Sequence, residues 1–362
     1  MINLNHKMIN VVSPINQLGY GITGLNLVKS LSKKIPLSLF VIGQPQVTNQ
    51  NDADIISKCL QNKHYLDFDA PCIKIWHQND MTQFAGKGKR IGFPIFELDE
   101  FNDLEKHHLS SLDSIFVCSK WAKEVIIKNI NIKTDSVHVI PLGFDENIFK
   151  VNNKENTDKT IFLNCGKWEV RKGHDVLHKI FNMAFEKSDN VELWMLCDNP
   201  FLKPNESKEW EDLYLNSKLG DKIKIFPRQQ THQEVYNIMA QADCGIFPSR
   251  AEGWNLELLE MMACGKTVIT TNYSAHTEFC TRLNSRLVDI DSVELAYDGK
   301  WFHGKCGNWA NIDEKAIEQF VNHLREVHRL KQTNNLITDA SSLETIRSYN
   351  WDNSANLVIK HV

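Results

Sequence analysis

Two glutamates, Glu252 and Glu260, lie in the stretch EGWNLELLE and could bind a polar substrate. Glu260 belongs to the run LEMMACG, which has scarcely another polar side chain, and a lone buried charge costs too much free energy without a partner. Glu252 precedes Gly253, which would let the chain pass close to a ligand. The pair indicates a ligand site. The alternative for Glu260 is that it forms, with Glu257 and Cys264, a narrow stripe of the helix that faces water.

A second cluster of chemically active residues is cationic. Lys167, Arg171 and Lys172 crowd the turn CGKWEVRKGHDVL, before a helix expected to start at Gly173 or His174. Basic residues at a helix N-terminus oppose the helix dipole, so this placement favours a bound anion over a solvated charge cluster. Charge-assisted contacts contribute roughly 1.5 to 3 kcal/mol each, so two lysines and free amides could hold a diphosphate without a metal.

The stretch GYGITG, with Gly19, Gly21 and Gly24, matches the GxGxxG pattern of dinucleotide-binding turns. The expected strand ends well before Gly19, and the next strand ends FVIGQP without an acid for a ribose. An NAD site is therefore disfavoured. A loop near an anionic or sugar ligand and a plain glycine-rich turn both stay open.

Metal and thiol motifs are weak in this sequence. The pattern DxD recurs in unrelated contexts, as chance would produce, and we assign no metal ligands. His174 and His178 lack the glutamate of HExxH, and we expect them on a solvated helix face. The nine cysteines form no CxxC pair and several lie in apolar runs, which predicts reduced core thiols.

Length and composition bound the class of protein. A chain of 362 residues suggests about two domains. Apolar residues make up 42% and charged residues 24%, an ordinary soluble composition, and a formal charge of -4 gives no case for nucleic acid. We find no signal peptide and no apolar run near the ~18 residues of a membrane span. We expect a cytoplasmic protein with at most peripheral membrane contact, through SKWAKEVIIKN.

Two series of apolar runs must position these residues. In the first, a strand at Met8 to Ser13 precedes the glycine stretch and a helix at about Thr23 to Lys33. Further strands are expected at residues 37–43, 72–76, 89–96, 114–119 and 137–143. We expect residues 44–54 and 78–89 to be exposed, and the polar run KVNNKENTDKT to join two domains.

The second series predicts strands at residues 160–166, 191–198, 222–227, 244–249 and 266–271. Helices are expected at about 174–186, 232–241, 256–264 and 313–331, with Asn255 as an N-cap and a last helix near 351–361 that could pack on either half. Continuous apolar strands alternating with helices predict an α/β fold with two doubly wound parallel sheets.

These motifs resemble the retaining GT-B glycosyltransferases of the group 1 class, also called family four. PSRAEGWNLELLEMMACGKTVITT resembles PSxxEGFGLxxLEAMAxGxPVI, including its E-x7-E spacing, and GKWEVRKG resembles GRxxxxKG with Lys167 in place of the arginine. PLGFDENIF, TNYSAHTEF and SYNWDNSANLV resemble further family segments. The match is dense in the C-terminal half and thin in the N-terminal half.

The resemblance implies three segments: 1–150, a Rossmann-like acceptor-binding domain; 151–340, a Rossmann-like nucleotide-sugar-binding domain; and 341–362, a helix that crosses back to the first domain. It implies transfer of a hexose-type sugar from a UDP-, GDP- or ADP-sugar, with retention, without a metal and without a cofactor. The acceptor could be a glycan, lipid, protein or small molecule, and the oligomeric state stays open. The rivals are an NAD-linked oxidoreductase using GYGITG and a non-catalytic sugar-nucleotide-binding protein of the same fold.

Carried over by position, the resemblance makes Glu252 and Lys172 catalytic and assigns Glu260 to the ribose hydroxyls. His77 is the nearest substitute for an N-domain histidine of the family. We expect Glu252→Gln and Lys172→Ala to abolish transfer and leave melting nearly unchanged. The other donor contacts implied are Lys167, Arg171, Gly253, Trp254, Asn255, Leu256, Gly19, Tyr20, Gly21 and, near the base between Phe226 and Gln229, Arg228.

Overall fold

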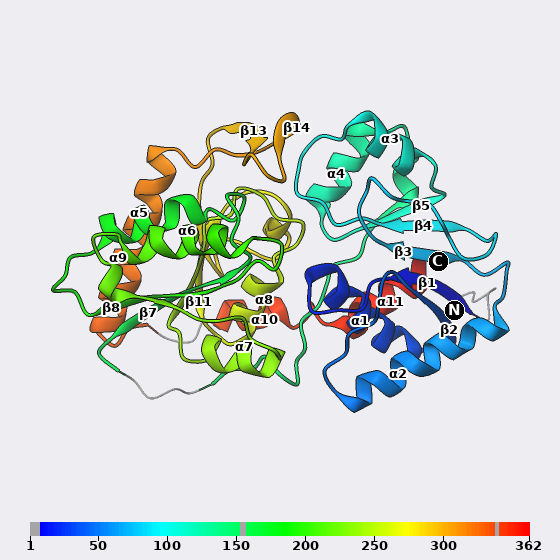
Figure 1. Ribbon diagram of the computed structural model, residues 1–362, viewed down its shortest axis with the longest axis horizontal. Helices are drawn as coiled ribbons and strands as arrows, with labels where there is room; N and C mark the ends of the chain where they lie inside the picture. Colours follow the sequence, from blue (N-terminus) through cyan, green and yellow to red (C-terminus); the bar gives the residue numbers. More distant parts are fainter. Residues whose placement is uncertain (1–7, 153–156, 337–339) are drawn as a thin grey trace. The chain divides into compact units, whose positions relative to one another are not determined.

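The chain folds into two compact units, and the computed structural model describes residues 8–152, 157–336 and 340–362 (Figure 1). Unit 1 comprises Met1–Gly143 and Ser348–Val362, and unit 2 comprises Phe144–Arg347. The sequence predicted a boundary near residue 150 and a final segment from residue 341. In the structure the chain passes between the units at Phe144 and again at Ser348.

Unit 1 is built on a six-stranded parallel sheet of order β2-β1-β3-β4-β5-β6. Its strands are β1 Ile9–Ser13, β2 Leu37–Val41, β3 Cys72–Ile75, β4 Arg90–Phe93, β5 Ser114–Val117 and β6 Val137–Val139. Its helices are α1 Gly19–Ser32, α2 Gln50–Gln61, α3 Asp103–Ser110, α4 Lys120–Asn129 and α11 Trp351–His361. The strands are short, apolar and mostly buried, as expected where helices cover a parallel sheet.

Helix α1 begins at Gly19, so the prediction of a loop over GYGITG is wrong. A Cβ atom on Gly21 would lie 2.1 Å from Asn16 Oδ1, and one on Gly24 would lie 2.1 Å from Ser13 Oγ. A Cβ on Gly19 would meet nothing within 4 Å. Two of the three glycines thus let the helix pack closely on the chain that leaves β1.

Helix α2 corrects the expectation that residues 44–54 form an exposed loop. Asn49 caps this helix by accepting a hydrogen bond from the Asp52 amide, and the buried Asp52 pairs with Lys29 at 2.6 Å. The helix is mostly polar, so its sequence carries a weak apolar signal. Residues 78–89 are exposed or half-buried, in line with the prediction, except for Met81, which is buried.

Unit 2 is built on a second six-stranded parallel sheet, of order β12-β11-β10-β7-β8-β9. Its strands are β7 Thr160–Gly166, β8 Val191–Cys197, β9 Ile223–Ile225, β10 Cys244–Phe247, β11 Thr267–Thr271 and β12 Arg286–Val288. Its helices are α5 His174–Ala184, α6 Pro204–Leu215, α7 His232–Met239, α8 Leu256–Ala263, α9 Glu314–Gln332 and α10 Ala340–Ile346. Within this unit α5, α6 and α9 cover one face of the sheet, and α7, α8 and α10 lie on the other (Figure 1).

An antiparallel hairpin, β13 Val293–Tyr297 and β14 His303–Ala310, follows β12 and was not predicted. Much of β13 is exposed, so this strand is not marked by the continuous apolar run on which the strand predictions relied. Short 3-10 turns complete the described elements: η1 Asn62–Tyr65, η2 Thr134–Ser136, η3 Gly220–Lys222 and η4 Ala275–Glu278.

Two general features of the described chain bear on function. The nine cysteines are unpaired and eight of them are buried, which confirms the prediction that they lie mostly in the core. Over the residues that the structure describes, no helix has both the length and the apolar character that crossing a bilayer requires.

The sheet order of unit 2 brings the two predicted clusters together. From β7 the chain proceeds through β8 to β9 on one side, and β10 lies on the other side of β7. In parallel sheets, ligands bind at the carboxyl edge where the order reverses. The loops that follow β7 and β10 meet at that point, and they carry Lys167 to Lys172 and Arg250 to Asn255.

Candidate functional site

The loops after β7 and β10 are held against each other by their backbones. The Arg250 amide donates to the Arg171 carbonyl at 2.7 Å. Gly173 has φ +75, and a Cβ there would lie 2.0 Å from the Pro248 carbonyl oxygen. Only glycine allows so close an approach in the left-handed region, so the cationic turn is fixed on the loop that carries Glu252.

His174, the first residue of α5, locks the cationic turn to β7. Its Nδ1 accepts the Glu169 amide at 3.1 Å, so Nε2 carries the proton and donates to Asn164 Oδ1 at 2.8 Å. Burial and then the nearby Lys172 charge lower the pKa of His174 to about 3, which keeps the ring neutral. The expectation that His174 and His178 lie on a solvated face is wrong, because both are buried.

Glu252 is the centre of the cluster. Its carboxylate accepts from Arg171 Nη1 at 2.9 Å, Lys172 Nζ at 3.0 Å and Ser249 Oγ at 2.8 Å. Burial alone would raise the pKa of Glu252, but Lys172 and Arg171 outweigh it and hold that pKa far below its ordinary value. The same carboxylate keeps Lys172 charged, since its attraction overcomes burial and raises the pKa of Lys172. Glu252 is therefore an ionised carboxylate in a buried site.

Glu169 is a second buried carboxylate that sequence reasoning missed. It accepts from Arg171 Nε at 3.0 Å and Nη2 at 2.7 Å, and it pairs with Lys167 at 3.0 Å. Glu257 lies 3.8 Å from Lys172. Three carboxylates therefore balance the charge of the three cations. The sequence had indicated the cations, as an anion site, without these carboxylates around them. A single glutamate among basic residues forms no pattern that marks it as a site residue. The only indication in the sequence was its position between the cations of GKWEVRKG.

Helix α8 starts at the cluster, with Asn255 as its predicted N-cap. Asn255 has φ 77, and its side chain accepts the Leu258 amide at 3.3 Å. Gly253 and Trp254 are buried beside it, Trp254 against Phe279 with ring centroids 4.9 Å apart, and Leu256 is half-buried.

Glu260 lies on α8 and differs from Glu252 in charge. Burial, then Glu257 and Asp145, raises the pKa of Glu260 well above its ordinary value, which favours the neutral acid over the carboxylate. Glu260 and Cys264 are buried, whereas the Glu257 side chain is 30% exposed. The stripe of these three residues does not face water as a whole.

The remaining predicted residues lie elsewhere. Arg228 follows β9, is 41% exposed, and has Nη1 3.7 Å from Asp198 Oδ2 after β8. In unit 1, the ring of Tyr20 lies 4.6 Å from that of His77, and its hydroxyl donates to the Ile95 carbonyl at 2.6 Å. Unit 1 therefore gathers Gly19 to Gly21 and the exposed His77 at the carboxyl ends of β3 and β4.

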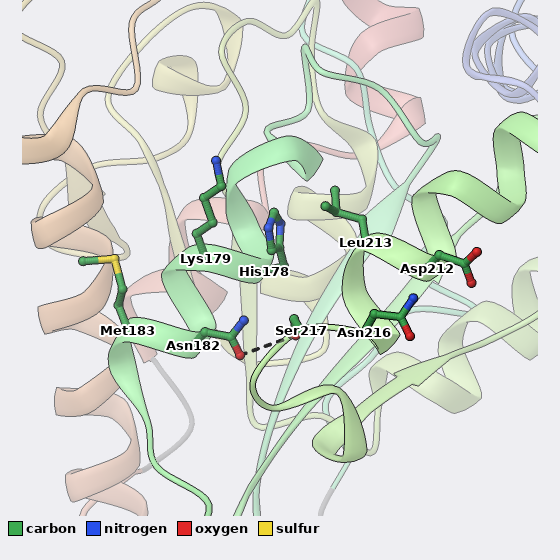
Figure 2. A pocket seen from close by; sticks show the side chains of 8 residues that line it. All are labelled: His178, Lys179, Asn182, Met183, Asp212, Leu213, Asn216 and Ser217. Atoms are coloured by element: carbon green, nitrogen blue, oxygen red, sulfur yellow. Dashed lines mark hydrogen bonds between the residues drawn. The ribbon is translucent and has the colours of Figure 1, made fainter.

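A hollow of about 700 Å³ lies between α5 and α6, away from this cluster (Figure 2). It is lined by residues from the second half of α5 and the end of α6, where chains in this topology return towards the amino ends of the strands. These residues are His178, Lys179, Asn182, Met183, Asp212, Leu213, Asn216 and Ser217. None of them was predicted as a site residue. Across the described ranges, no group of three or more His, Cys, Asp or Glu side chains is arranged to hold a metal ion.

A family model matches the part of the chain that carries this cluster. Residues 145–293 match the family model described as glycosyl transferases group 1. This segment is similar to the group 1 glycosyl transferases. It contains every member of the cluster around Glu252, and it ends where β13 begins, so most of the hairpin lies beyond it.

Curated relatives of this chain are distant. The GPI3 subunit of phosphatidylinositol N-acetylglucosaminyltransferase from Saccharomyces cerevisiae is 21% identical over 281 residues, covering 68% of this chain and 60% of the yeast protein. Mannosylfructose-phosphate synthase from Agrobacterium fabrum is 25% identical over 215 residues, covering 54% of this chain and 46% of that protein. The chain thus spans less than two thirds of each relative.

Solved structures match nearly the whole chain. Sucrose-phosphate synthase from Thermosynechococcus elongatus has a TM-score of 0.71 at 14% identity, over 98% of this chain and 97% of that one. HepE from Anabaena, in complex with UDP and glucose, has a TM-score of 0.68 at 15% identity, over 98% of each chain. These likenesses confirm the predicted fold class, a GT-B arrangement of two Rossmann-like α/β domains.

Proposed function

We propose that the protein is a glycosyltransferase that moves a hexose-type sugar from a nucleotide diphosphate sugar to an acceptor, with retention and without a metal. The observation that carries this proposal is Glu252, an ionised buried carboxylate held by Arg171 and Lys172 in a group 1 segment. An ionised carboxylate accepts hydrogen bonds from hydroxyls and stabilises positive charge that develops at a sugar carbon.

The diphosphate has a natural partner in the cationic turn. Lys167 is 38% exposed and is the cation that a ligand reaches first, while Lys172 lies behind it with a fixed charge. A departing diphosphate gains negative charge, and preorganised cations stabilise that charge without rearrangement. The amides of Trp254 to Leu256, at the N-terminus of α8, add a further positive field.

The other residues take the roles that the family resemblance assigns. A neutral Glu260 can both donate and accept, which suits the two hydroxyls of a ribose. Arg228 would lie near the base, and the segment Gly19 to Gly21 and His77 of unit 1 would serve the donor and the acceptor.

The relatives' names are consistent with a sugar nucleotide and leave the acceptor open. One is named for phosphatidylinositol, another for mannosylfructose phosphate, and HepE was solved with UDP and glucose. The acceptor is a glycan, lipid, protein or small molecule, and we place the reaction in the cytoplasm.

A ligand panel tests the proposed donor. UDP, GDP and ADP are each added to the protein, and thermal unfolding is recorded. One of them should stabilise the fold, by about 2.7 kcal/mol at 100 times its dissociation constant. Hydrolysis of the corresponding sugar nucleotide without acceptor then separates an enzyme from a protein that only binds. A response to NAD with none to any nucleoside diphosphate would refute the proposal.

A further inference from the structure

Two half-exposed aromatic rings pack edge to face beside the candidate site, and the proposed roles use neither. Phe201, in the loop after β8, is 52% exposed, and Trp301, in the turn of the β13–β14 hairpin, is 45% exposed. Their ring centroids lie 6.0 Å apart with planes at 76°. They come from segments 100 residues apart in the chain, so the fold, not local sequence, brings them together.

Both rings are held in place by bonds of their own loops. Asp298 Oδ1 accepts the amides of Lys300, Trp301 and Phe302 at 2.9, 2.7 and 2.8 Å, which fixes the turn under the indole. The Phe201 amide donates to Asn199 Oδ1 at 3.1 Å, and Asn199 Nδ2 donates to the Trp168 carbonyl at 3.0 Å.

The hairpin turn is also tied to α6, by Lys300 Nζ, which contacts both carboxylate oxygens of Glu206 at 2.7 Å. A surface built in advance binds a ligand without the entropic cost of ordering side chains.

The rings continue outward from the cationic turn. Lys167 Nζ pairs with Glu169 and lies 5.7 Å above the centroid of Phe201. Lys300 Nζ lies 5.6 Å from the centroid of Trp301. Phe201 and Trp301 therefore share Lys167 with the proposed donor site. They lie on the side of unit 2 that carries α6, whereas Glu260 belongs to α8, on the other face of the sheet (Figure 1).

We propose that Phe201 and Trp301 form a saccharide-binding subsite that holds the sugar part of the acceptor beside Lys167. The C–H faces of a pyranose carry partial positive charge and stack on the negative face of an aromatic ring. Its hydroxyls can bond to Lys167, Lys300 and Glu206. A purely apolar ligand would instead bury these charged groups without compensation. The subsite's role in transfer rests on the proposed glycosyltransferase function.

Titration calorimetry with four trisaccharides, maltotriose, cellotriose, mannotriose and chitotriose, tests this subsite. The proteins are wild type, Phe201→Ala, Trp301→Ala and the control Tyr65→Ala, which removes an aromatic side chain that is 80% exposed in unit 1. At least one trisaccharide should bind wild type and Tyr65→Ala equally, and bind each of the other two variants about fivefold more weakly. UDP, GDP and ADP should bind all four proteins alike, and matching melting curves establish that the variants fold.

Three results would overturn the subsite. The first is that no trisaccharide binds wild type, and the second is that a trisaccharide binds all the variants equally. The third is that nucleoside diphosphates bind Phe201→Ala and Trp301→Ala more weakly, which would assign the rings to the base of the nucleotide. Failure of the proposed function looks different. In that case UDP, GDP and ADP bind none of the proteins, while the dependence of trisaccharide binding on the two rings remains.

Discussion

At the scale of single residues, the informative pair is Glu252 and Glu260. Both are buried, at 4% and 7% exposure, yet their pKa values are displaced in opposite directions. Cations surround Glu252, whereas Glu260 has acidic neighbours. The surroundings of Glu252 favour the ion and those of Glu260 favour the neutral acid, so the same substitution should have different effects at the two sites.

We predict that Glu252→Gln destabilises unit 2 by about 3 kcal/mol, because it removes the buried carboxylate that Arg171 and Lys172 share. This replaces the expectation, drawn from the sequence, that melting would be nearly unchanged. Glu260→Gln replaces a neutral acid by an amide of the same shape and should cost less than about 1 kcal/mol. Urea unfolding of the two variants measures both values, and equal costs would contradict the assigned charge states.

His174 should make unit 2 sensitive to acid. Its pKa is about 3 in the fold and about 6.5 when unfolded, so between these values only the unfolded chain binds the proton. From pH 7 to pH 5 this should cost about 2 kcal/mol of unfolding free energy. The measurement compares the decrease in unfolding free energy from pH 7 to pH 5 in wild type with the decrease in His174→Gln and in His174→Asn, which should be smaller. Identical pH dependence in all three proteins would refute the assignment.

At the same scale, the sequence predicted the cations and the two family glutamates but not their mutual pairing. Glu252 lies 80 residues from Lys172, and only the order of β7 and β10 brings them within 3.0 Å. Glu169 and His174 were overlooked as site residues for a different reason. The role of His174 depends on the Glu169 amide and on Asn164, and the role of Glu169 depends on how the turn places its carboxylate against Arg171 and Lys167. A pattern of side-chain types records none of these contacts.

At the scale of elements, strands were easier to predict than helices. The buried strands of both sheets are continuous apolar runs, and nearly all were located from these runs. Helices α2 and α6 were missed because few of their residues are buried, so their apolar periodicity is faint. The hairpin was missed because Val293, Leu295 and Tyr297 leave one side of β13 exposed.

The glycines of α1 test whether GYGITG exists for packing. Gly19→Ala should be neutral or stabilise by up to about 1 kcal/mol, because the added methyl group meets nothing and alanine favours the helix. Gly21→Ala should destabilise unit 1 by about 1 to 3 kcal/mol, because its Cβ would overlap Asn16. Chemical unfolding followed by circular dichroism measures both, and similar effects at the two glycines would contradict the packing role.

At the scale of the whole molecule, unit 1 is assembled from both ends of the described chain. Helix α11 packs against α1, with Trp351, Ala355, Val358 and Ile359 buried. Ser354 Oγ donates to the Pro141 carbonyl at 2.6 Å, and a Cβ on Gly143 would lie 2.3 Å from the Trp351 amide nitrogen. The last helix is an integral part of this unit.

Deleting Ser348–Val362 should therefore destabilise unit 1 and spare unit 2. Each large apolar side chain that loses its burial removes about 1.5 to 3 kcal/mol. Hydrogen exchange with mass spectrometry should show lost protection in α1 and the strands β1 to β6, with unchanged protection in β7 to β11. The exposed Lys360→Ala serves as control. Retained protection of α1 in the deletion variant would contradict this prediction.

The same chain path has a consequence for biosynthesis. Unit 2 is one continuous stretch and can fold as soon as it has left the ribosome, as domains generally do. Unit 1 is synthesised first but must wait for α11, and until then the apolar side of α1 is open to solvent and to chaperones. The half of the protein that is made first is thus the half that is finished last.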